Sequence, residues 1–313
     1  MRMKKNLILY FVLLAVSLAL TGFLFSQERI IDLAAEYDLS FQEASGDVGY
    51  YKMRTVYYHG NSLGITHSRE ELISTFKREA VKIEKGIHLV KFTWKEAKIG
   101  QDKKIQGEIS NWKILPYVSG FTYLLDFENL NFPDQIDFSP IPGTLQGMKF
   151  MVNILDAHAQ FDLLRTQSAG GINRIKKTGD KISNPGAGQS TSWDFNAFIQ
   201  DSDFTNGEYD TMFTGVCMLD GKKCAVLEYI NSESRLSSRT QITPKMIIEQ
   251  EGTSNFWGHI FIDLETGNLV KGDLYEYVIV HATMPGQSQQ MRLFERRLIE
   301  IRRVSEEEFN DEI

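Results

Sequence analysis

Apolar and polar residues alternate with a period of two along most of this chain, which predicts β-strands that bury one face. The alternating segments are rich in Tyr, Val, Thr and Ile and are separated by turn-forming residues. They are residues 35–44, 47–59, 120–130, 212–219, 223–230, 255–264, 269–284 and 289–304. The turn sequences Asp220-Gly221 and Glu265–Asn268 predict that the strands beside them form hairpins.

Residues 69–100 carry two periodicities. Leu72, Phe76, Ala80 and Ile83 recur at helical spacing, so an amphipathic helix is one interpretation. Glu84-Lys85-Gly86, however, separates two runs that both alternate. We favour the second interpretation, a β-hairpin that turns at residues 84–86.

The clearest helical segment is residues 144–166, with Thr144 as its candidate N-cap and Gly170 and Gly171 beyond its end. Its apolar residues cover so much of the helical circumference that we expect it to be buried on several sides. The apolar side chains that could line a cavity there are Met148, Met151, Val152, Leu155 and Phe161.

The order of these elements predicts the fold class. Strands over 37–130, one helix over 144–166 and strands over 211–303 favour antiparallel sheet over a doubly wound fold. We therefore predict a mainly β (α+β) fold. It would be a large curved antiparallel sheet or half-barrel with one long buried helix, formed by residues 27–313 as a single domain.

Residues 1–26 predict export. Three basic residues precede a mostly apolar run over 7–25, which is typical of a bacterial-type signal. The run is also long enough to span a bilayer, so an uncleaved N-terminal anchor is the alternative. Phe23 stands where a lipoprotein needs its acylated cysteine. The periplasm is the expected location, and a secreted or N-terminally anchored protein are the alternatives.

Charge excludes some partners. The chain has a formal net charge of −7, and removing residues 1–26 with their three basic residues and no acids changes it to −10. An acidic domain lacks the electrostatic signature of nucleic-acid binding and is repelled by anionic membrane surfaces. The basic cluster at 296–303 is interleaved with acidic residues, and we expect it to form a solvated, salt-bridged surface.

A possible nucleophile occurs in the sequence Gly60-Asn61-Ser62-Leu63-Gly64. It matches the G-x-S-x-G pattern of a serine-hydrolase nucleophile elbow. An elbow needs a helix that begins directly after the serine, and the following residues contain no such helix start. We therefore expect a turn between two strands and rank a hydrolase that uses Ser62 last among the functional hypotheses.

The two cysteines flank a predicted hairpin turn. If Asp220-Gly221 is a two-residue turn, Cys217 and Cys224 lie directly opposite each other. In an exported protein such a pair is expected to oxidise. We predict a structural Cys217–Cys224 disulfide, with a longer turn or two free thiols as alternatives.

No metal or cofactor site is predicted. The six histidines form neither an H-E-x-x-H motif nor another paired helical spacing that is typical of zinc sites. We expect these histidines to be structural.

The export signal, the strand-rich ends, the buried segment 144–166 and the hairpin over 261–277 resemble, in architecture, the LolA-like periplasmic lipoprotein carriers. That resemblance implies a curved sheet whose concave face holds a helix and an apolar chain. The first functional hypothesis is therefore a non-enzymatic binding or carrier protein for a lipid or other apolar ligand. The second is a structural or protein-interaction component of the cell envelope.

Overall fold

The computed structural model describes residues 34–39, 43–61, 63–84, 87–102, 105, 107–128, 132–161, 172–183, 187–192, 194, 199–243, 246–283, 290–311 and 313. It divides the chain into two compact units, Met1–Ala35 and Glu36–Ile313. The predicted export segment lies outside the described residues, and everything below concerns the second unit. Within the described ranges no helix is both long and apolar enough to cross a membrane.

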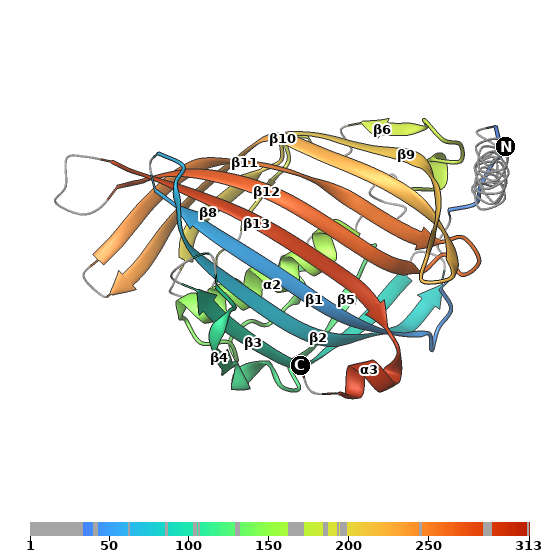
Figure 1. Cartoon of the computed structure of the whole chain (residues 1–313), viewed down its shortest axis with the longest axis horizontal. Coiled ribbons are helices and arrows are strands. Elements are labelled where there is room, and N and C mark those ends of the chain that lie inside the picture. The colour runs from blue at the N-terminus through green and yellow to red at the C-terminus, as the bar shows by residue number, and fades with distance from the viewer. Residues whose placement is uncertain are drawn as a thin grey trace, which may run out of the picture. The chain divides into compact units, whose positions relative to one another are not determined.

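The second unit is built on one antiparallel sheet, to which the described residues contribute 13 strands. Along the main path the order is β4-β3-β2-β1-β13-β12-β11-β10-β8-β7; β5 pairs with β3, and β9 pairs with β10 and β6. The strands are β1 Val48–Gly60, β2 Thr66–Glu84, β3 Ile87–Asp102, β4 Ser110–Ile114, β5 Thr122–Asp126, β6 Lys181–Ser183, β7 Ser190–Thr191, β8 Ile199–Thr205, β9 Glu208–Leu219, β10 Lys222–Thr243, β11 Met246–Asp263, β12 Leu269–Thr283 and β13 Met291–Val304. The mainly β, antiparallel prediction is therefore confirmed. Figure 1 shows β1 beside β13, so the N-terminal and C-terminal groups of strands form one continuous surface.

Short turns set the register of the hairpins. β2 and β3 pair from Glu84 and Ile87 onward, which confirms the hairpin interpretation of residues 69–100. Asp220 and Gly221 both have positive φ, 48° and 77°, the backbone of a two-residue hairpin turn that glycine adopts without strain. The predicted pairing of Cys217 with Cys224 follows from this turn and is confirmed.

The helices are few. The two α-helices among the described residues are α2 Leu145–Phe161 and α3 Glu306–Asn310, and the 3-10 helices are η1 Pro116–Val118, η2 Phe132–Gln135 and η4 Ile172–Arg174. Thr144 caps α2 as predicted, because its hydroxyl accepts the Gly147 amide N–H at 3.1 Å. Residues 162–166, where the predicted helix continues, lie outside the described residues.

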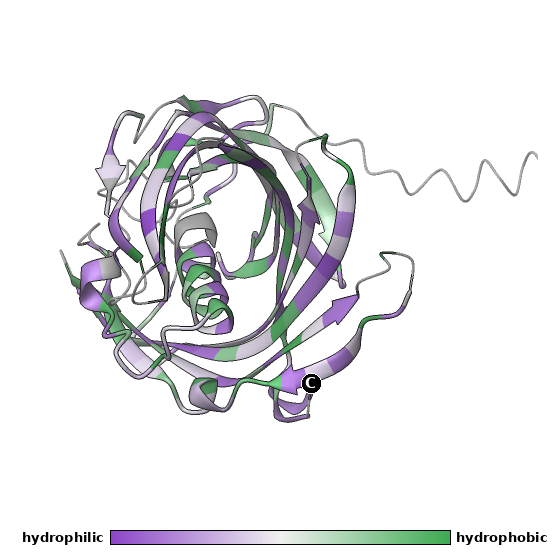
Figure 2. Ribbon diagram, turned by 90° about the vertical axis from the view of Figure 1, so that its left-hand side faces the viewer, coloured by the Kyte–Doolittle hydropathy of each residue, from purple (hydrophilic) through white to green (hydrophobic). Residues whose placement is uncertain are grey.

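The sheet curves around α2 (Figure 2). Phe150, Met151, Ile154 and Leu155 of this helix belong to the hydrophobic core. The Phe150 ring meets Trp94 of β3 edge-on, with ring centroids 5.0 Å apart. Aromatic side chains from β2, β3 and β5 fill the rest of that side of the interior; they include Phe76, Phe92, Trp94 and Tyr123.

One strand prediction is wrong. The described parts of the segment 35–44, residues 35–39 and 43–44, are not strand, although Leu39 is buried in the core. Tyr37 donates its amide N–H to the Lys176 carbonyl at 2.9 Å, so the segment is fixed by a loop contact and not by a strand partner. Alternation alone misled the prediction, because a short segment that buries one apolar side chain in a loop has the same pattern.

Candidate functional site: a charged network between helix and sheet

A stripe of polar side chains on α2 faces the sheet. Lys149, Asn153 and Asp156 follow each other at helical spacing, so they share one side of the helix. All three are buried, with exposed fractions of 6%, 0% and 6%. Buried polar groups are strongly destabilising unless they are hydrogen-bonded or paired. The concave face of the sheet must therefore supply their partners.

Arg297 of β13 is the partner of Asp156. Its guanidinium donates to Asp156 Oδ2 at 2.8 Å and to Asp156 Oδ1 at 3.3 Å. The same guanidinium donates through Nε to Glu276 of β12, whose other carboxylate oxygen accepts the Ser254 hydroxyl of β11 at 2.5 Å. Burial raises the pKa of Asp156 to about 6, although the charge of Arg297 acts in the opposite direction. One buried cation thus holds two buried carboxylates, on the helix and on the sheet.

Asn153 occupies the middle of the stripe. Its Oδ1 accepts the Thr55 hydroxyl of β1 at 2.7 Å, and its Nδ2 donates to the Ser74 hydroxyl of β2 at 2.9 Å. The amide therefore bridges two neighbouring strands and fixes the height of α2 above them.

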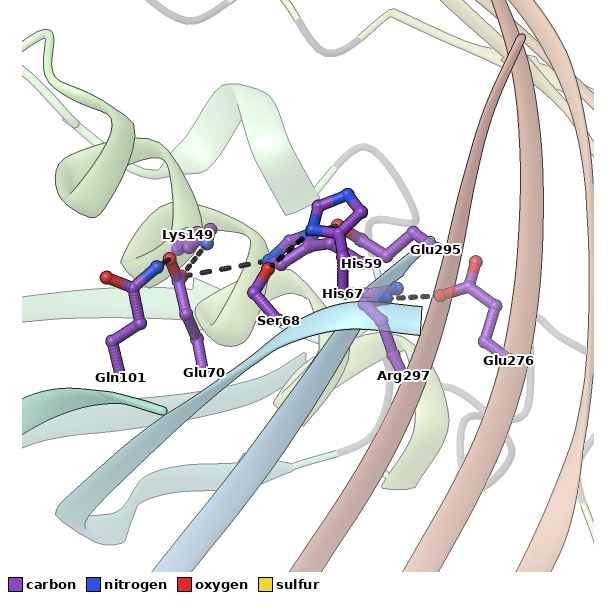
Figure 3. Close-up of polar contacts among 9 residues, drawn as sticks. All are labelled: His59, His67, Ser68, Glu70, Gln101, Lys149, Glu276, Glu295 and Arg297. Atoms are coloured by element: carbon purple, nitrogen blue, oxygen red, sulfur yellow. Dashed lines mark hydrogen bonds and ion pairs between the residues drawn. The ribbon is translucent and has the colours of Figure 1, made fainter. Parts of the chain in front are cut away.

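At the other end of the stripe, Glu70 of β2 contacts side chains from three other elements (Figure 3). It forms an ion pair with Lys149 of α2, accepts Gln101 Nε2 of β3 at 3.3 Å, and lies 3.9 Å from Nε2 of His59 on β1. The Lys149 ammonium also lies 4.8 Å from the centre of the Tyr57 ring. Burial opposes ionisation of Glu70, but hydrogen bonding to His59 and the charge of Lys149 outweigh it and lower its pKa to about 2.

His59 continues the chain of charges to β13. Its Nδ1 lies 3.1 Å from Glu295 Oε2. Hydrogen bonds to Glu295 and then to Glu70 raise the pKa of His59 to about 9, against the effect of burial. At neutral pH the imidazole is therefore a cation between two carboxylates. A row of alternating charges results, which we call the charge row; its members are Glu295, His59, Glu70 and Lys149.

A cavity of about 770 Å³ opens where this row ends. It lies between the first turns of α2 and the strands β2, β3 and β4. The lining residues are Glu70, Ile99, Gly100, Gln101, Asp102, Gly107, Glu108, Ser110, Asn111, Lys113, Leu145, Gln146 and Lys149. Glu70, Gln101 and Lys149 are thus both members of the network and walls of the cavity.

The cavity differs from the one expected from the sequence. Met151 and Leu155, two of the five predicted lining residues, are packed into the core, and Met148 packs against it. Val152 is half-buried, and the side chain of Phe161 lies outside the described part of the chain. The helix residues that line the described cavity are instead Leu145, Gln146 and Lys149.

The predicted disulfide is not formed. Cys217 and Cys224 are opposite each other but are free thiols, and the Cys224 thiol lies 3.7 Å from the Lys222 carbonyl. Directly opposed strand residues have Cβ atoms about 4.5–5.5 Å apart, whereas a disulfide needs about 3.5–4.5 Å. Correct register is therefore not sufficient for the bond.

The residues around Ser62 form a hairpin loop between β1 and β2. Asn61 Oδ1 accepts the amide N–H groups of Leu63 and Ile65 at 3.0 and 3.1 Å. A strand, not the helix of a nucleophile elbow, begins at Thr66. Ser62 itself lies outside the described residues.

The described residues hold neither a catalytic dyad at His67 and Ser68 nor a metal site. Ser68 Oγ lies 3.3 Å from Nδ1 of the neighbouring His67 (Figure 3), but His67 is exposed. That pair therefore lacks the buried, oriented setting of a catalytic dyad. Within the described ranges no group of three or more His, Cys, Asp or Glu side chains is arranged to hold a metal ion.

The sequence-based analysis missed the charged network. It assigned the cluster 296–303 to a solvated surface, and this is wrong for Arg297, which is 8% exposed. A signal was present in the helix, because Lys149, Asn153 and Asp156 interrupt an otherwise apolar circumference at regular spacing. Polar residues on a helix that is enclosed by the sheet must find partners on that sheet.

Comparison with known proteins adds little. No family model matches the chain, and no curated protein matches it. Among solved structures, Salmonella typhi OmpF in complex with daunomycin is similar at 7% identity with a TM-score of 0.21, over 83% of this chain and 98% of the other.

Two further structures belong to proteins described as exported or as a lipoprotein. One is a Bacteroides fragilis protein with a YmcC-like fold, at 9% identity and a TM-score of 0.16, over 84% of this chain and 97% of the other. The other is from Parabacteroides distasonis, at 12% identity and a TM-score of 0.17, over 82% and 96%. Likenesses at these TM-scores support no inference about fold or function, and the LolA-like resemblance stays a prediction.

Proposed function

We propose that this chain is an exported, non-enzymatic binding protein, and that the cavity between α2 and strands β2, β3 and β4 is its ligand site. The proposal of export rests on residues 1–26 of the sequence. The proposal of binding rests on one observation, a cavity of about 770 Å³ whose floor is made of buried and half-buried polar side chains that fix one another. Small-molecule sites typically have volumes of about 300–1,000 Å³ and a few well-placed polar groups.

Preorganisation is the physical argument for binding at this place. Glu70 is fixed by contacts to Lys149, Gln101 and His59, which come from three different elements. Side chains that are already ordered lose little conformational entropy when a ligand binds. The floor of the cavity is therefore suited to hydrogen-bond a ligand without rearrangement.

Native mass spectrometry tests the proposal. The full-length chain would be expressed in a host that exports it and purified without detergent, with residues 1–26 cleaved or retained as the host processes them. We expect a stoichiometric adduct that disappears after organic or acid extraction. A Ser110→Trp variant, which places a large side chain in the cavity-facing row of the wall, should lose the adduct, and Gln189→Trp in the exposed loop before β7 should keep it.

The outcomes separate the hypotheses. An adduct that persists in Ser110→Trp would place binding elsewhere and contradict the cavity assignment. A bare mass together with one envelope protein crosslinked to the chain would instead favour the second hypothesis, an interaction component of the envelope. A lipid or other apolar ligand, expected from the sequence, is one of the adduct classes that extraction identifies.

A further inference from the structure

The register of three strands determines which groups face the cavity. Glu70 of β2 pairs with Gln101 of β3, and Gln101 pairs with Ser110 of β4. Directly opposed residues point to the same side of a sheet. These three side chains therefore form a polar row across the cavity wall. Ile99 and Lys113 form the next row, and Ile99 is opposite the fully buried Leu72, which places both rows on the concave face.

The charges of the described lining residues nearly compensate one another. Glu70 and Lys149 form an ion pair with each other. Asp102, at the edge, accepts the Gly107 amide N–H at 3.0 Å. The remaining charged residues of the described lining are Glu108 and Lys113, which are exposed and of opposite sign. With three carboxylates and two ammonium groups, the described lining has a formal net charge of −1, so it carries no strong charge with which to select an ionic ligand.

The neutral lining groups are rich in donors and acceptors. Gln101 uses one amide hydrogen for Glu70, which leaves its second N–H and its carbonyl oxygen. Gln146, on the exposed side of the first turn of α2, supplies a second amide. Ser110 accepts Asn111 Nδ2 at 3.2 Å and keeps its own O–H as a donor. Amides and hydroxyls that offer both donors and acceptors are complementary to hydroxyl groups, which also do both.

The described lining offers little to a purely apolar ligand. Its apolar side chains are Ile99 and Leu145, one on the sheet and one on the helix. A lipid chain in this position would cover Glu70, Gln101 and Lys149. These side chains would lose their hydrogen bonds to water and gain none from the lipid chain. Burial of polar groups without new hydrogen bonds weakens binding.

We infer that the ligand is an uncharged, multiply hydroxylated compound of the saccharide class, held between the row Glu70–Gln101–Ser110 and Gln146 of α2. This inference rests on the proposed function, because it assigns a ligand class to the same cavity. The ion pair Glu70–Lys149 closes the floor, and the two glutamines orient the ligand hydroxyls.

The test combines release of the adduct with direct binding. The adduct from the native mass spectrum is hydrolysed and analysed for monosaccharides and for fatty acids. In parallel, saturation-transfer NMR on the full chain uses a panel of neutral oligosaccharides of hexoses and N-acetylhexosamines. Palmitate is the apolar comparison probe and spermine is the charged one. Gln146→Leu and Gln101→Leu each remove one amide and should weaken saccharide binding by about threefold to tenfold. Gln189→Leu is the matched control, in an exposed loop beside β7, at the other end of the strand order.

Monosaccharides in the hydrolysate, or saturation transfer to a neutral saccharide that both cavity variants weaken and Gln189→Leu does not, support the inference. A fatty acid in the hydrolysate, or palmitate binding that the cavity variants abolish, overturns the saccharide class and leaves the cavity as a ligand site. If there is no adduct and no probe binds, both the ligand class and the proposed function fail.

Discussion

Replacement of Arg297 by methionine removes the one cation that joins Asp156 of α2 to Glu276 of β12. Methionine keeps much of the side-chain volume, so the loss of charge is the main change. The three side chains have exposed fractions of only 9%, 8% and 7%. Two carboxylates would then be left buried without their partner.

The expected destabilisation is large. Removing one partner of a buried ion pair typically lowers the free energy of unfolding by about 3–5 kcal/mol, because the remaining charge is uncompensated. The matched control is Arg302→Met, which breaks the Arg302–Glu308 pair, where both side chains are more than a third exposed. An exposed pair of this kind contributes about 0–1 kcal/mol.

The dependence on pH identifies the cause. Burial already raises the pKa of Asp156 to about 6 in the native protein, above its usual 3.8. An acid with a raised native pKa binds its proton more tightly when folded, so stability falls as pH rises from about 4 to about 6 and is then level. Without Arg297 that pKa rises further, and the loss extends to higher pH. One further pKa unit corresponds to about 1.4 kcal/mol.

Urea unfolding of the wild type, Arg297→Met and Arg302→Met at pH 5 and pH 8 measures both effects. We expect Arg297→Met to be destabilised by about 3–5 kcal/mol at pH 8 and by at least about 1.4 kcal/mol less at pH 5. The combined variant with Asp156→Asn and Glu276→Gln should recover most of the loss at pH 8. A cost equal to that of Arg302→Met, or one that is the same at both pH values, would refute the argument for a buried, uncompensated pair.

Three further changes test other parts of the site. The native pKa of His59 is raised to about 9, so its contribution to the free energy of unfolding is full below pH 6.5 and is lost as pH rises through 9. The difference in unfolding free energy between wild type and His59→Gln should therefore shrink over that window. The native pKa of Glu70 is about 2, so the difference between wild type and Glu70→Gln should shrink as pH falls below 4.5. A constant difference would contradict either assignment. Asn153→Ala leaves two buried hydroxyls without their amide partner and should destabilise by about 1–3 kcal/mol in urea unfolding; an effect below about 0.5 kcal/mol, as at an ordinary surface site, would show that the bridge does not form. Burial raises the pKa of both thiols, that of Cys224 to about 11, so iodoacetamide should modify the half-buried Cys217 slowly and Cys224 only after unfolding, whereas an intact mass two hydrogens lower would show the disulfide.

Local chemistry explains which parts of the fold could be predicted. The turn at Asp220-Gly221 and the pairing of Glu84 with Ile87 determine register over a few residues, so the hairpins that contain them were predicted correctly. The Thr144 cap and the start of α2 follow from one side chain and the next turn of helix. Each of these features is decided by residues that are neighbours in the sequence.

The site could not be assembled in the same way. Lys149 and Glu70 are 79 residues apart, and Asp156 and Arg297 are 141 residues apart. No local pattern pairs residues over such distances; the curvature of the sheet decides which strands face the helix. Arg297 illustrates the difficulty, because the other arginines of the same cluster, such as the adjacent Arg296, are only half-buried and the fold alone separates them.

The polar stripe of α2 links stability to binding. An apolar face could slide on the sheet or rotate against it with little loss, whereas Lys149, Asn153 and Asp156 each require a specific partner on β1, β2 or β13. Buried polar groups are costly when misplaced, so they favour one orientation of the helix. That orientation also places Leu145, Gln146 and Lys149 opposite β3 and β4 and thereby forms the cavity.

A change at Asp156, two turns away from the cavity, should therefore weaken ligand binding as well as stability, whereas an apolar substitution of equal stability cost at Leu155 should lower stability alone. Measuring both quantities in both variants distinguishes a helix that positions the site from one that only fills the core.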